Sequence, residues 1–197
     1  MKNILIMLGL LMFCLNGVAL SQDISENPKA IFIIPSSNFQ DDEFSITKAV
    51  LENNGIDVSI ASSSLDVAVG MNGLEVKPDS LIEEIELSDY HALIFIGGEG
   101  AQEYYQNEEA LDLVREAYKN KKYIGAICIA PVILAKAGIL RGKFATSSQA
   151  GTRQLRRHGA KYRSKDVIVS GKVITAKGPA ASKEFANAVV KALQSGK

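Results

Sequence analysis

Unbroken runs of apolar residues recur along the chain, each about the length of one buried strand. The clearest are residues 30–34 (AIFII), 92–96 (ALIFI) and 121–127 (KKYIGAI), the last of which is apolar after its two lysines, and 56–61 is a further candidate. Strands that are apolar on both faces are typical of parallel sheets covered by helices on each side. Two more strands are predicted over 166–170 and 173–176, because Gly171-Lys172 between them marks a hairpin turn.

Segments with a helical pattern fill the intervals between these runs. Helices are predicted over 41–54, 107–120, 129–137, 151–157 and 180–193, mostly from apolar positions that recur at about 3.6 residues. We also expect a strand over 143–147 and a small hairpin over 67–76, whereas 80–87 fits either a helical turn or an extended piece. This alternation predicts an α/β fold with a parallel sheet between two helical layers.

Ligand sites in such sheets lie at the carboxyl ends of the strands. Three segments leave strand ends of this kind, namely residues 35–43, residues 97–100 and Cys128. Any chemistry is therefore expected where these three segments meet.

The first 21 residues depart from the domain pattern. Lys2 precedes an apolar stretch over 4–15, and residues 19–21 (ALS) place small side chains at the −3 and −1 positions of a cleavage site. This arrangement is typical of a signal peptide, and the apolar stretch is shorter than a permanent membrane span needs. We expect cleavage after Ser21 and export.

The leader sets the expected domain boundaries and location. A linker over 22–28 and one domain over 29–197 would remain, in a periplasmic or secreted protein. An uncleaved membrane anchor is one alternative. Lipidation at Cys14 is another, although the bulky Phe13 before it argues against a lipoprotein signal.

Composition and charge narrow the classes of partner. The chain has 197 residues, of which 47% are hydrophobic, and its 22 basic and 22 acidic residues balance to a formal charge of zero. This is the composition of a globular domain, without an overall field that attracts nucleic acid or anionic membranes. We expect no nucleic-acid partner and, once the leader is removed, no stable membrane association. The local cluster of Arg153, Arg156 and Arg157 fits a solvated helix face.

Cys128 is the residue with the clearest chemical potential. The sequence has two cysteines, and loss of the leader removes Cys14, so the mature chain has no internal disulfide. Cys128 stands in GAICIAP (125–131), where a strand passes into a helix. Such a junction aims helix N-terminal amides at the side chain, and these amides favour the thiolate and lower the thiol pKa. The alternative is an inert buried cysteine.

Three further residues are expected beside Cys128. The backbone amides of Gly98 and Ile129 are candidates for an oxyanion hole. Glu43 begins the helix after the first strand, and a protonated carboxyl there would donate a hydrogen bond to the thiolate or relay a proton. The alternative for Glu43 is an acid favoured in a first helical turn by the helix dipole. No residues with metal-ligand spacing occur, so neither a metal nor another cofactor is expected.

Four blocks of the sequence resemble the ThiJ/PfpI superfamily. This superfamily includes the parkinsonism-associated deglycase and the PfpI peptidase-like proteins. The resemblance implies a flavodoxin-like three-layer sandwich of the class I glutamine amidotransferase type, with a nucleophile elbow at Cys128 and commonly a homodimer. The blocks are AIFIIPSSNFQDDEFSITKAVLENNGIDVSIAS (30–62), YHALIFIGGEGA (90–101), YIGAICIAPVILAKAGILRGKFATSS (123–148) and VITAKGPAAS (173–182).

The resemblance assigns roles residue by residue. It implies that Cys128 is the nucleophile, that Glu43 is the acid hydrogen-bonded to it, and that Gly98 and Ile129 supply the oxyanion amides. Peptidase-like members have a histidine directly after the cysteine, where this chain has Ile129. Deglycase-like members supply a histidine near the position of Ser147.

The histidines and the missing Cys–His pair decide between activities. His91 and His158 are expected to be structural, and without a Cys–His pair peptide hydrolysis is not expected. The favoured function is a glyoxalase- or deglycase-like reaction on small carbonyl compounds, through Cys128 with Glu43 handling protons. The alternative is a ligand-binding protein or a sensor of oxidative stress without turnover, oxidised at Cys128.

Overall fold

The computed structural model describes residues 27–195, which contain one central seven-stranded sheet. All neighbouring strands in it are parallel except one pair at an edge, residues 167–170 and 173–176, which forms the antiparallel hairpin predicted around Gly171. The predicted α/β fold with a mostly parallel sheet is therefore confirmed. From one edge to the other, the strands are β11 (Val167–Ser170), β12 (Val173–Ala176), β8 (Tyr123–Ile127), β7 (Ala92–Phe95), β1 (Lys29–Ile33), β3 (Asp57–Ser62) and β6 (Ser80–Leu81).

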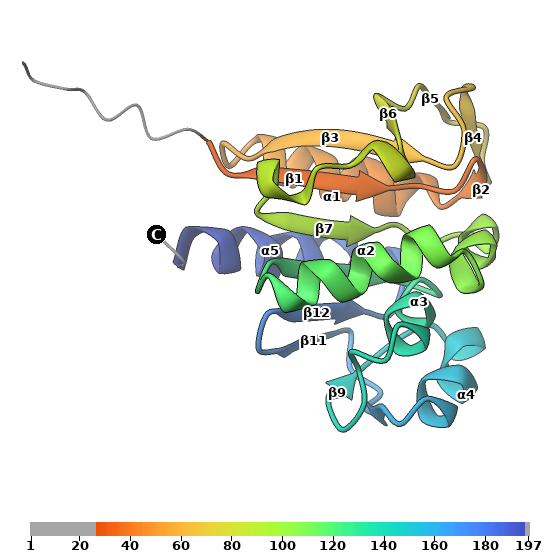
Figure 1. The fold of residues 1–197 in the computed structure, drawn as a ribbon, viewed down its shortest axis with the longest axis vertical. Coiled ribbons are helices and arrows are strands. Elements are labelled where there is room, and N and C mark those ends of the chain that lie inside the picture. The colour runs from red at the N-terminus through yellow and green to blue at the C-terminus, as the bar shows by residue number, and fades with distance from the viewer. Residues whose placement is uncertain (1–26, 196–197) are drawn as a thin grey trace, which may run out of the picture.

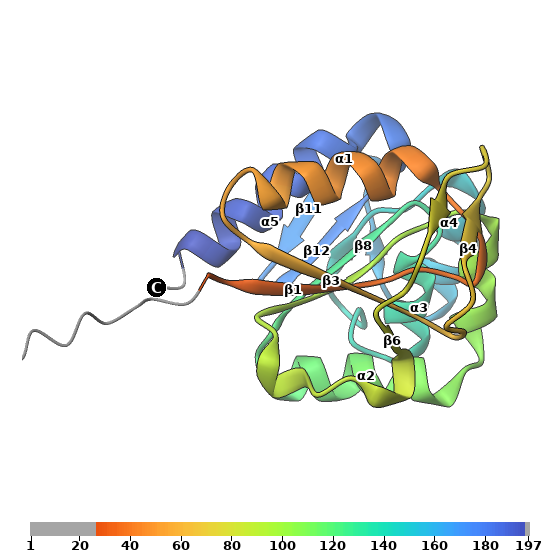
Figure 2. The ribbon, with the colours of Figure 1, turned by 90° about the horizontal axis from the view of Figure 1, so that it is seen from above.

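Helices cover both faces of this sheet (Figures 1 and 2). On one face, α1 (Asp41–Glu52) packs beside α5 (Ser182–Ser195). On the other face lie α2 (Glu108–Lys119) and α3 (Pro131–Lys136), and α4 (Gln149–Arg157) packs against α3. Short 3-10 turns complete the helical segments: η1 (Ile82–Glu84), η2 (Leu87–Asp89), η3 (Glu99–Tyr105) and η4 (Pro179–Ala181).

Two small sheets lie outside the central one. The first contains β2 (Ser37–Phe39), β4 (Ala68–Gly70) and β5 (Glu75–Val76), and its antiparallel β4–β5 pair confirms the hairpin predicted over 67–76. The second pairs β9 (Phe144–Ala145) with β10 (Lys161–Tyr162). The strand predicted over 143–147 is therefore only two residues long and lies outside the central sheet. The undecided segment 80–87 forms β6, which extends the central sheet, and then η1 and the start of η2.

The unbroken apolar runs serve two cores, one on each face of the sheet. In β1, Ile31 and Ile33 pack in the core beneath α2 and α3, while Phe32 faces α1 and α5. There the Phe32 ring meets Phe44 edge to face, with centroids 6.2 Å apart, and Phe185 of α5 packs in the same core. Because successive strand side chains point to opposite faces, a strand covered on both sides favours apolar residues at successive positions.

The predicted signal peptide over 1–21 and most of the predicted linker lie outside the described residues. Cleavage after Ser21 therefore stays a prediction. In the range 27–195, no helix is both long and apolar enough to cross a membrane.

Candidate active site

The three segments expected to meet at one sheet edge do so. The strands β8, β7 and β1 are neighbours in the sheet, so Cys128, Gly97-Gly98 and the start of α1 follow adjacent carboxyl ends. The N–H of Gln40, which precedes α1, donates to the Gly97 carbonyl at 3.0 Å. This bond fixes the first turn of α1 against the Gly-Gly loop.

Cys128 occupies a left-handed backbone conformation, with φ of 63°. A residue other than glycine adopts this conformation only when its surroundings hold it there. Two backbone hydrogen bonds do so: the Cys128 N–H donates to Ala176 O at 3.0 Å, and the Cys128 carbonyl accepts from Ser148 N–H at 2.8 Å. The elbow, residues 127–129, is thereby tied to β12 on one side and to the start of α4 on the other.

Glu43 is completely buried at this edge of the sheet. Its Oε2 accepts the Gly97 N–H at 3.0 Å, and its own N–H donates to the Gln40 side chain at 2.8 Å. A surface acid in a first helical turn needs no such burial, so the dipole alternative does not account for Glu43. Within the described chain, Oε1 has no nitrogen or oxygen donor, and the Cys128 thiol is the polar group beside this carboxyl.

Burial dominates the protonation of Glu43. Burial raises the pKa of Glu43 to about 7 from an ordinary value of 4.5, and the negative charge of Asp42 adds to the increase. The Gly97 N–H and the Cys128 thiol act in the opposite direction and lower this pKa. Glu43 therefore changes its charge near neutral pH.

The absence of side chains at Gly97 and Gly98 allows these groups to come together. A Cβ on Gly97 would lie 2.5 Å from the Cys128 Cβ and 2.6 Å from Glu43 Oε2. Gly98 has φ of 102°, and a Cβ there would lie 2.2 Å from the backbone oxygen of Asn38. Both contacts are far inside van der Waals separation, so only glycine fits this loop.

The thiol pKa differs from the sequence-based expectation. Burial raises the pKa of the half-buried Cys128 to about 11, and the negative charge of Glu43 adds to this increase. The Gly98 N–H and the Ser148 hydroxyl lower the pKa, but by less. The predicted lowering by helix N-terminal amides is therefore wrong. The helix predicted from residue 129 begins only at Pro131, whose nitrogen carries no hydrogen, so its amides do not serve the sulfur.

The two amides proposed for the oxyanion hole differ in what the structure shows of them. The Gly98 N–H is directed at the thiol. The Ile129 N–H has no hydrogen-bond acceptor among residues 27–195. The Cys128 N–H is already bonded to Ala176, so it cannot take part.

Ser148 and Tyr105 also border the sulfur, and the sequence did not single them out. The Ser148 Oγ is buried without a hydrogen-bond partner in the described chain, and its hydroxyl lowers the pKa of the Cys128 thiol. The Tyr105 hydroxyl donates to Ile129 O at 3.2 Å, and burial and the charge of Cys128 raise its pKa to about 12. Ser147, next to Ser148, is fully buried and donates to the Ser148 carbonyl instead.

Neither histidine reaches this site. His91 Nδ1 accepts the Lys29 N–H at 3.1 Å, at the amino end of the neighbouring strands β1 and β7, which confirms its expected structural role. His158 caps the carboxyl end of α4. Across the described residues, no three His, Cys, Asp or Glu side chains gather as a metal site.

Comparison with known proteins identifies the family. A sequence model of the DJ-1/PfpI family matches residues 28–192. The chain belongs to the DJ-1/PfpI family. Among family members, an uncharacterized protein of Methanocaldococcus jannaschii is 36% identical over 92% of this chain and 90% of its own length.

Other relatives carry named activities at lower identity. The deglycase PfpI of Pyrococcus furiosus is 28% identical over 76% of this chain and 90% of its own. A glutathione-independent glyoxalase of Caenorhabditis elegans is 28% identical over 84% of this chain and 88% of its own. Among solved structures, the ThiJ/PfpI domain protein from Brachyspira murdochii is 31% identical, with a TM-score of 0.84 over 86% of this chain and 98% of its own. The flavodoxin-like family fold predicted from the sequence is thus confirmed.

Proposed function

We propose that this family member converts small carbonyl compounds through Cys128, in a reaction of the glyoxalase or deglycase type. One observation carries the proposal: a fully buried carboxyl, Glu43, with a pKa of about 7 stands against a thiol whose own pKa is about 11. A base that is ionised at neutral pH can take the proton of such a thiol as the sulfur reacts. The relatives named deglycase and glyoxalase support the same class of substrate.

The first step is addition of sulfur to an aldehyde, written here for methylglyoxal. The Glu43 carboxylate accepts the thiol proton while the sulfur forms a bond to the aldehyde carbon. The carbonyl electron pair moves to the oxygen, where the N–H groups of Gly98 and Ile129 stabilise the negative charge. Glu43 then returns its proton to this oxygen, which gives a neutral hemithioacetal.

The remaining steps move two protons and consume one water. Glu43, again ionised, removes the hydrogen on the former aldehyde carbon and delivers it to the neighbouring ketone carbon. The hydroxyl proton of the hemithioacetal passes to the ketone oxygen, which becomes the hydroxyl group of lactate. The aldehyde carbon is oxidised to the thioester level while the ketone carbon is reduced, so no external redox partner is needed. Water then hydrolyses the thioester, and the products are lactate and the free thiol of Cys128.

Lactate formation from methylglyoxal tests the proposal. We expect the wild-type protein to form lactate, with a rate that rises with pH near 7 as Glu43 ionises. The variants Cys128→Ser and Glu43→Gln should lose this activity, whereas His158→Gln, outside the site, should keep it. Wild-type lactate formation no faster than that of Cys128→Ser would end the enzyme proposal.

Oxidation of Cys128 without turnover is the less supported alternative. Peroxide reacts with thiolates, and a pKa of about 11 leaves little thiolate at neutral pH. Intact mass after mild peroxide treatment separates the two functions. A rapid gain of two oxygens on wild type, absent from Cys128→Ser, would favour the sensor instead.

Export is part of the same proposal and rests on the leader pattern alone. Amino-terminal sequencing of the protein from its native cells tests it, with Gln22 as the expected first residue. A mature chain that still begins at Met1 would contradict cleavage.

A further inference from the structure

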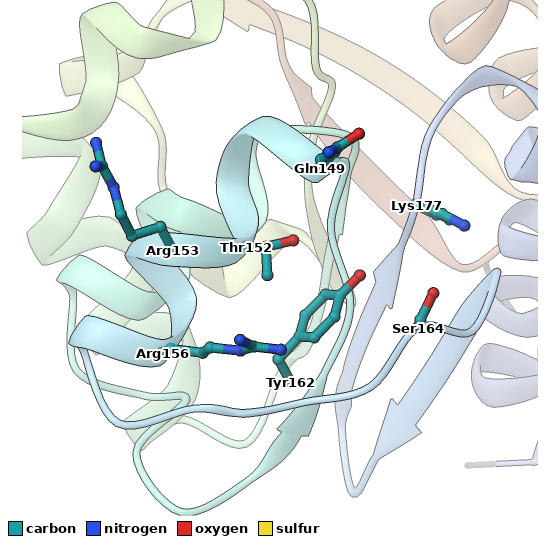
Figure 3. A pocket seen from close by; sticks show the side chains of 7 residues that line it. All are labelled: Gln149, Thr152, Arg153, Arg156, Tyr162, Ser164 and Lys177. Atoms are coloured by element: carbon teal, nitrogen blue, oxygen red, sulfur yellow. The ribbon is translucent and has the colours of Figure 1, made fainter.

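A cavity lies beside α4, between this helix and the segment that leads from β10 to β11 (Figure 3). Its volume is about 570 Å³, within the range of small-molecule sites. It opens to solvent, and its lining is polar and basic. The side chains that line it are Gln149, Thr152, Arg153, Arg156, Tyr162, Ser164 and Lys177.

Two uncompensated cations characterise this cavity, which we call the α4 cavity. The Arg156 guanidinium lies over the Tyr162 ring, 5.3 Å from its centroid, so its direction is fixed. Lys177 lines the opposite wall, and in this view its ammonium group is directed away from α4, at the end of a flexible side chain (Figure 3). Neither cation forms an ion pair in the described part of the chain, and no acidic side chain there lines the cavity. Arg153 is set aside, because its guanidinium points away from the other groups (Figure 3).

Neutral hydrogen-bond donors stand between the two cations. The hydroxyl groups of Tyr162 and Ser164 point toward the space between α4 and Lys177 (Figure 3). Gln149 and Thr152, on the first turn of α4, supply an amide and a further hydroxyl. This set of donors around two positive charges suits an anion with several acceptor oxygens.

Two residues that line the α4 cavity directly follow residues hydrogen-bonded to the elbow. Lys177 directly follows Ala176, whose carbonyl accepts the Cys128 N–H at 3.0 Å. Gln149 directly follows Ser148, whose N–H donates to the Cys128 carbonyl at 2.8 Å. Both walls are therefore held to the backbone of the reactive cysteine, although no residue of the thiol site itself lines the cavity.

We propose that the α4 cavity binds the phosphate group of a phosphorylated small carbonyl compound and so presents its carbonyl carbon to Cys128. This substrate class rests on the carbonyl chemistry proposed above. A phosphate dianion matches the two charges of Arg156 and Lys177, whereas a carboxylate would leave one cation uncompensated. The volume exceeds that of a phosphate group alone, which leaves space for the carbon chain that bears it.

Binding to a variant without the thiol tests the site independently of turnover. The mature Cys128→Ser protein is titrated by calorimetry with glycerol 3-phosphate, which has no carbonyl group, and in parallel with glycerol and with lactate. We expect saturable binding of glycerol 3-phosphate and at least about tenfold weaker binding of lactate, which carries one charge. Equal binding of lactate and glycerol 3-phosphate would overturn the assignment to phosphate.

Charge variants locate the site. Arg156→Gln and Lys177→Gln, each in the Cys128→Ser background, should weaken glycerol 3-phosphate binding about tenfold. Arg157→Gln is the matched control, because Arg157 is an exposed cation on the same helix that does not line the cavity. An equal loss in Arg157→Gln, or none in the other two variants, would overturn the proposal.

Protection of the thiol tests the link between cavity and elbow. In the wild-type protein, glycerol 3-phosphate should slow alkylation of Cys128 by iodoacetamide at least about threefold, and the Arg156→Gln/Lys177→Gln double variant should show no protection. Unprotected alkylation at saturating glycerol 3-phosphate would overturn the placement beside the sulfur. These readouts need no turnover, so they stand even if methylglyoxal is not converted.

Discussion

At the scale of single residues, the site depends on the missing side chain of Gly97. We predict that Gly97→Ala removes lactate formation and alters the thiol titration, because its Cβ would overlap both the Cys128 Cβ and Glu43 Oε2. Gly73→Ala is the control, since its Cβ meets nothing within 4 Å and only the left-handed backbone at φ of 90° costs about 1 kcal/mol. A Gly97→Ala protein with a wild-type thiol titration would show that the close approach is dispensable.

The charge of Glu43 gives a second prediction at this scale. Both this charge and the carboxyl–thiol contact raise the pKa of Cys128, so Glu43→Gln should lower it from about 11. The sequence alone suggested that Glu43→Gln would raise the pKa of Cys128, because the protonated carboxyl was expected to donate a hydrogen bond to the thiolate. Thiolate absorbance measured against pH shows whether the pKa of Cys128 falls or rises in Glu43→Gln. Asp42→Asn, a change at the exposed neighbouring acid, is the control and should move the Cys128 titration far less.

At the scale of elements, the stability of the fold depends on the protonation of Glu43 in the first turn of α1. The pKa of Glu43 is about 7 in the folded chain against an ordinary 4.5, so the folded state binds this proton more tightly than the unfolded state. Its contribution to stability is complete below about pH 4.5 and is lost as the pH rises through 7. We predict a fall of about 3 kcal/mol in the free energy of unfolding across this window.

Urea unfolding at several pH values measures this fall. Glu43→Gln should flatten the dependence, because a buried amide carries no charge at any pH. Glu109→Gln is the matched control, since Glu109 is an exposed acid in the first turn of α2 and its change should leave the slope intact. If the free energy of unfolding fell equally steeply with pH in wild type and Glu43→Gln, another group would be responsible for the pH dependence.

Elements also show what the sequence can reveal. The other strands of the central sheet and the helices α1, α2 and α5 follow from local pattern, whereas β6, in the undecided segment 80–87, does not. The start of α3 does not, since residues 129 and 130 are as apolar as the helix itself while the chain there makes the turn that holds Cys128. The short β9 likewise resembles a core strand in composition, and only tertiary pairing with β10 places it outside the main sheet.

The site residues were predictable to different degrees. The family resemblance pointed to Cys128 and Glu43, and the structure places them together. Gln40 carries no such signal, although its side chain accepts the Glu43 N–H and its own N–H holds Gly97. Ser148 and Tyr105 approach the sulfur from segments distant in sequence, which local pattern cannot show.

At the scale of the whole molecule, zero net charge conceals an uneven distribution. The lining of the α4 cavity has cations without acids among the described residues, whereas acids crowd the first turn of α1. These two regions flank the elbow from opposite sides of the sheet edge.

The family resemblance also implies a homodimer, which stays a prediction for sedimentation equilibrium of the mature protein. A monomer at micromolar concentration would contradict it.

The two backbone bonds that hold the elbow have a consequence for amide hydrogen exchange. The Cys128 N–H is committed to Ala176, while the N–H of the next residue, Ile129, has no acceptor in the described chain. Two consecutive amides should therefore exchange with deuterium at very different rates, slowly at Cys128 and quickly at Ile129. A bound oxyanion would slow only the second. This pair of neighbours is thus a built-in reporter of occupancy, readable by NMR without any chemical label.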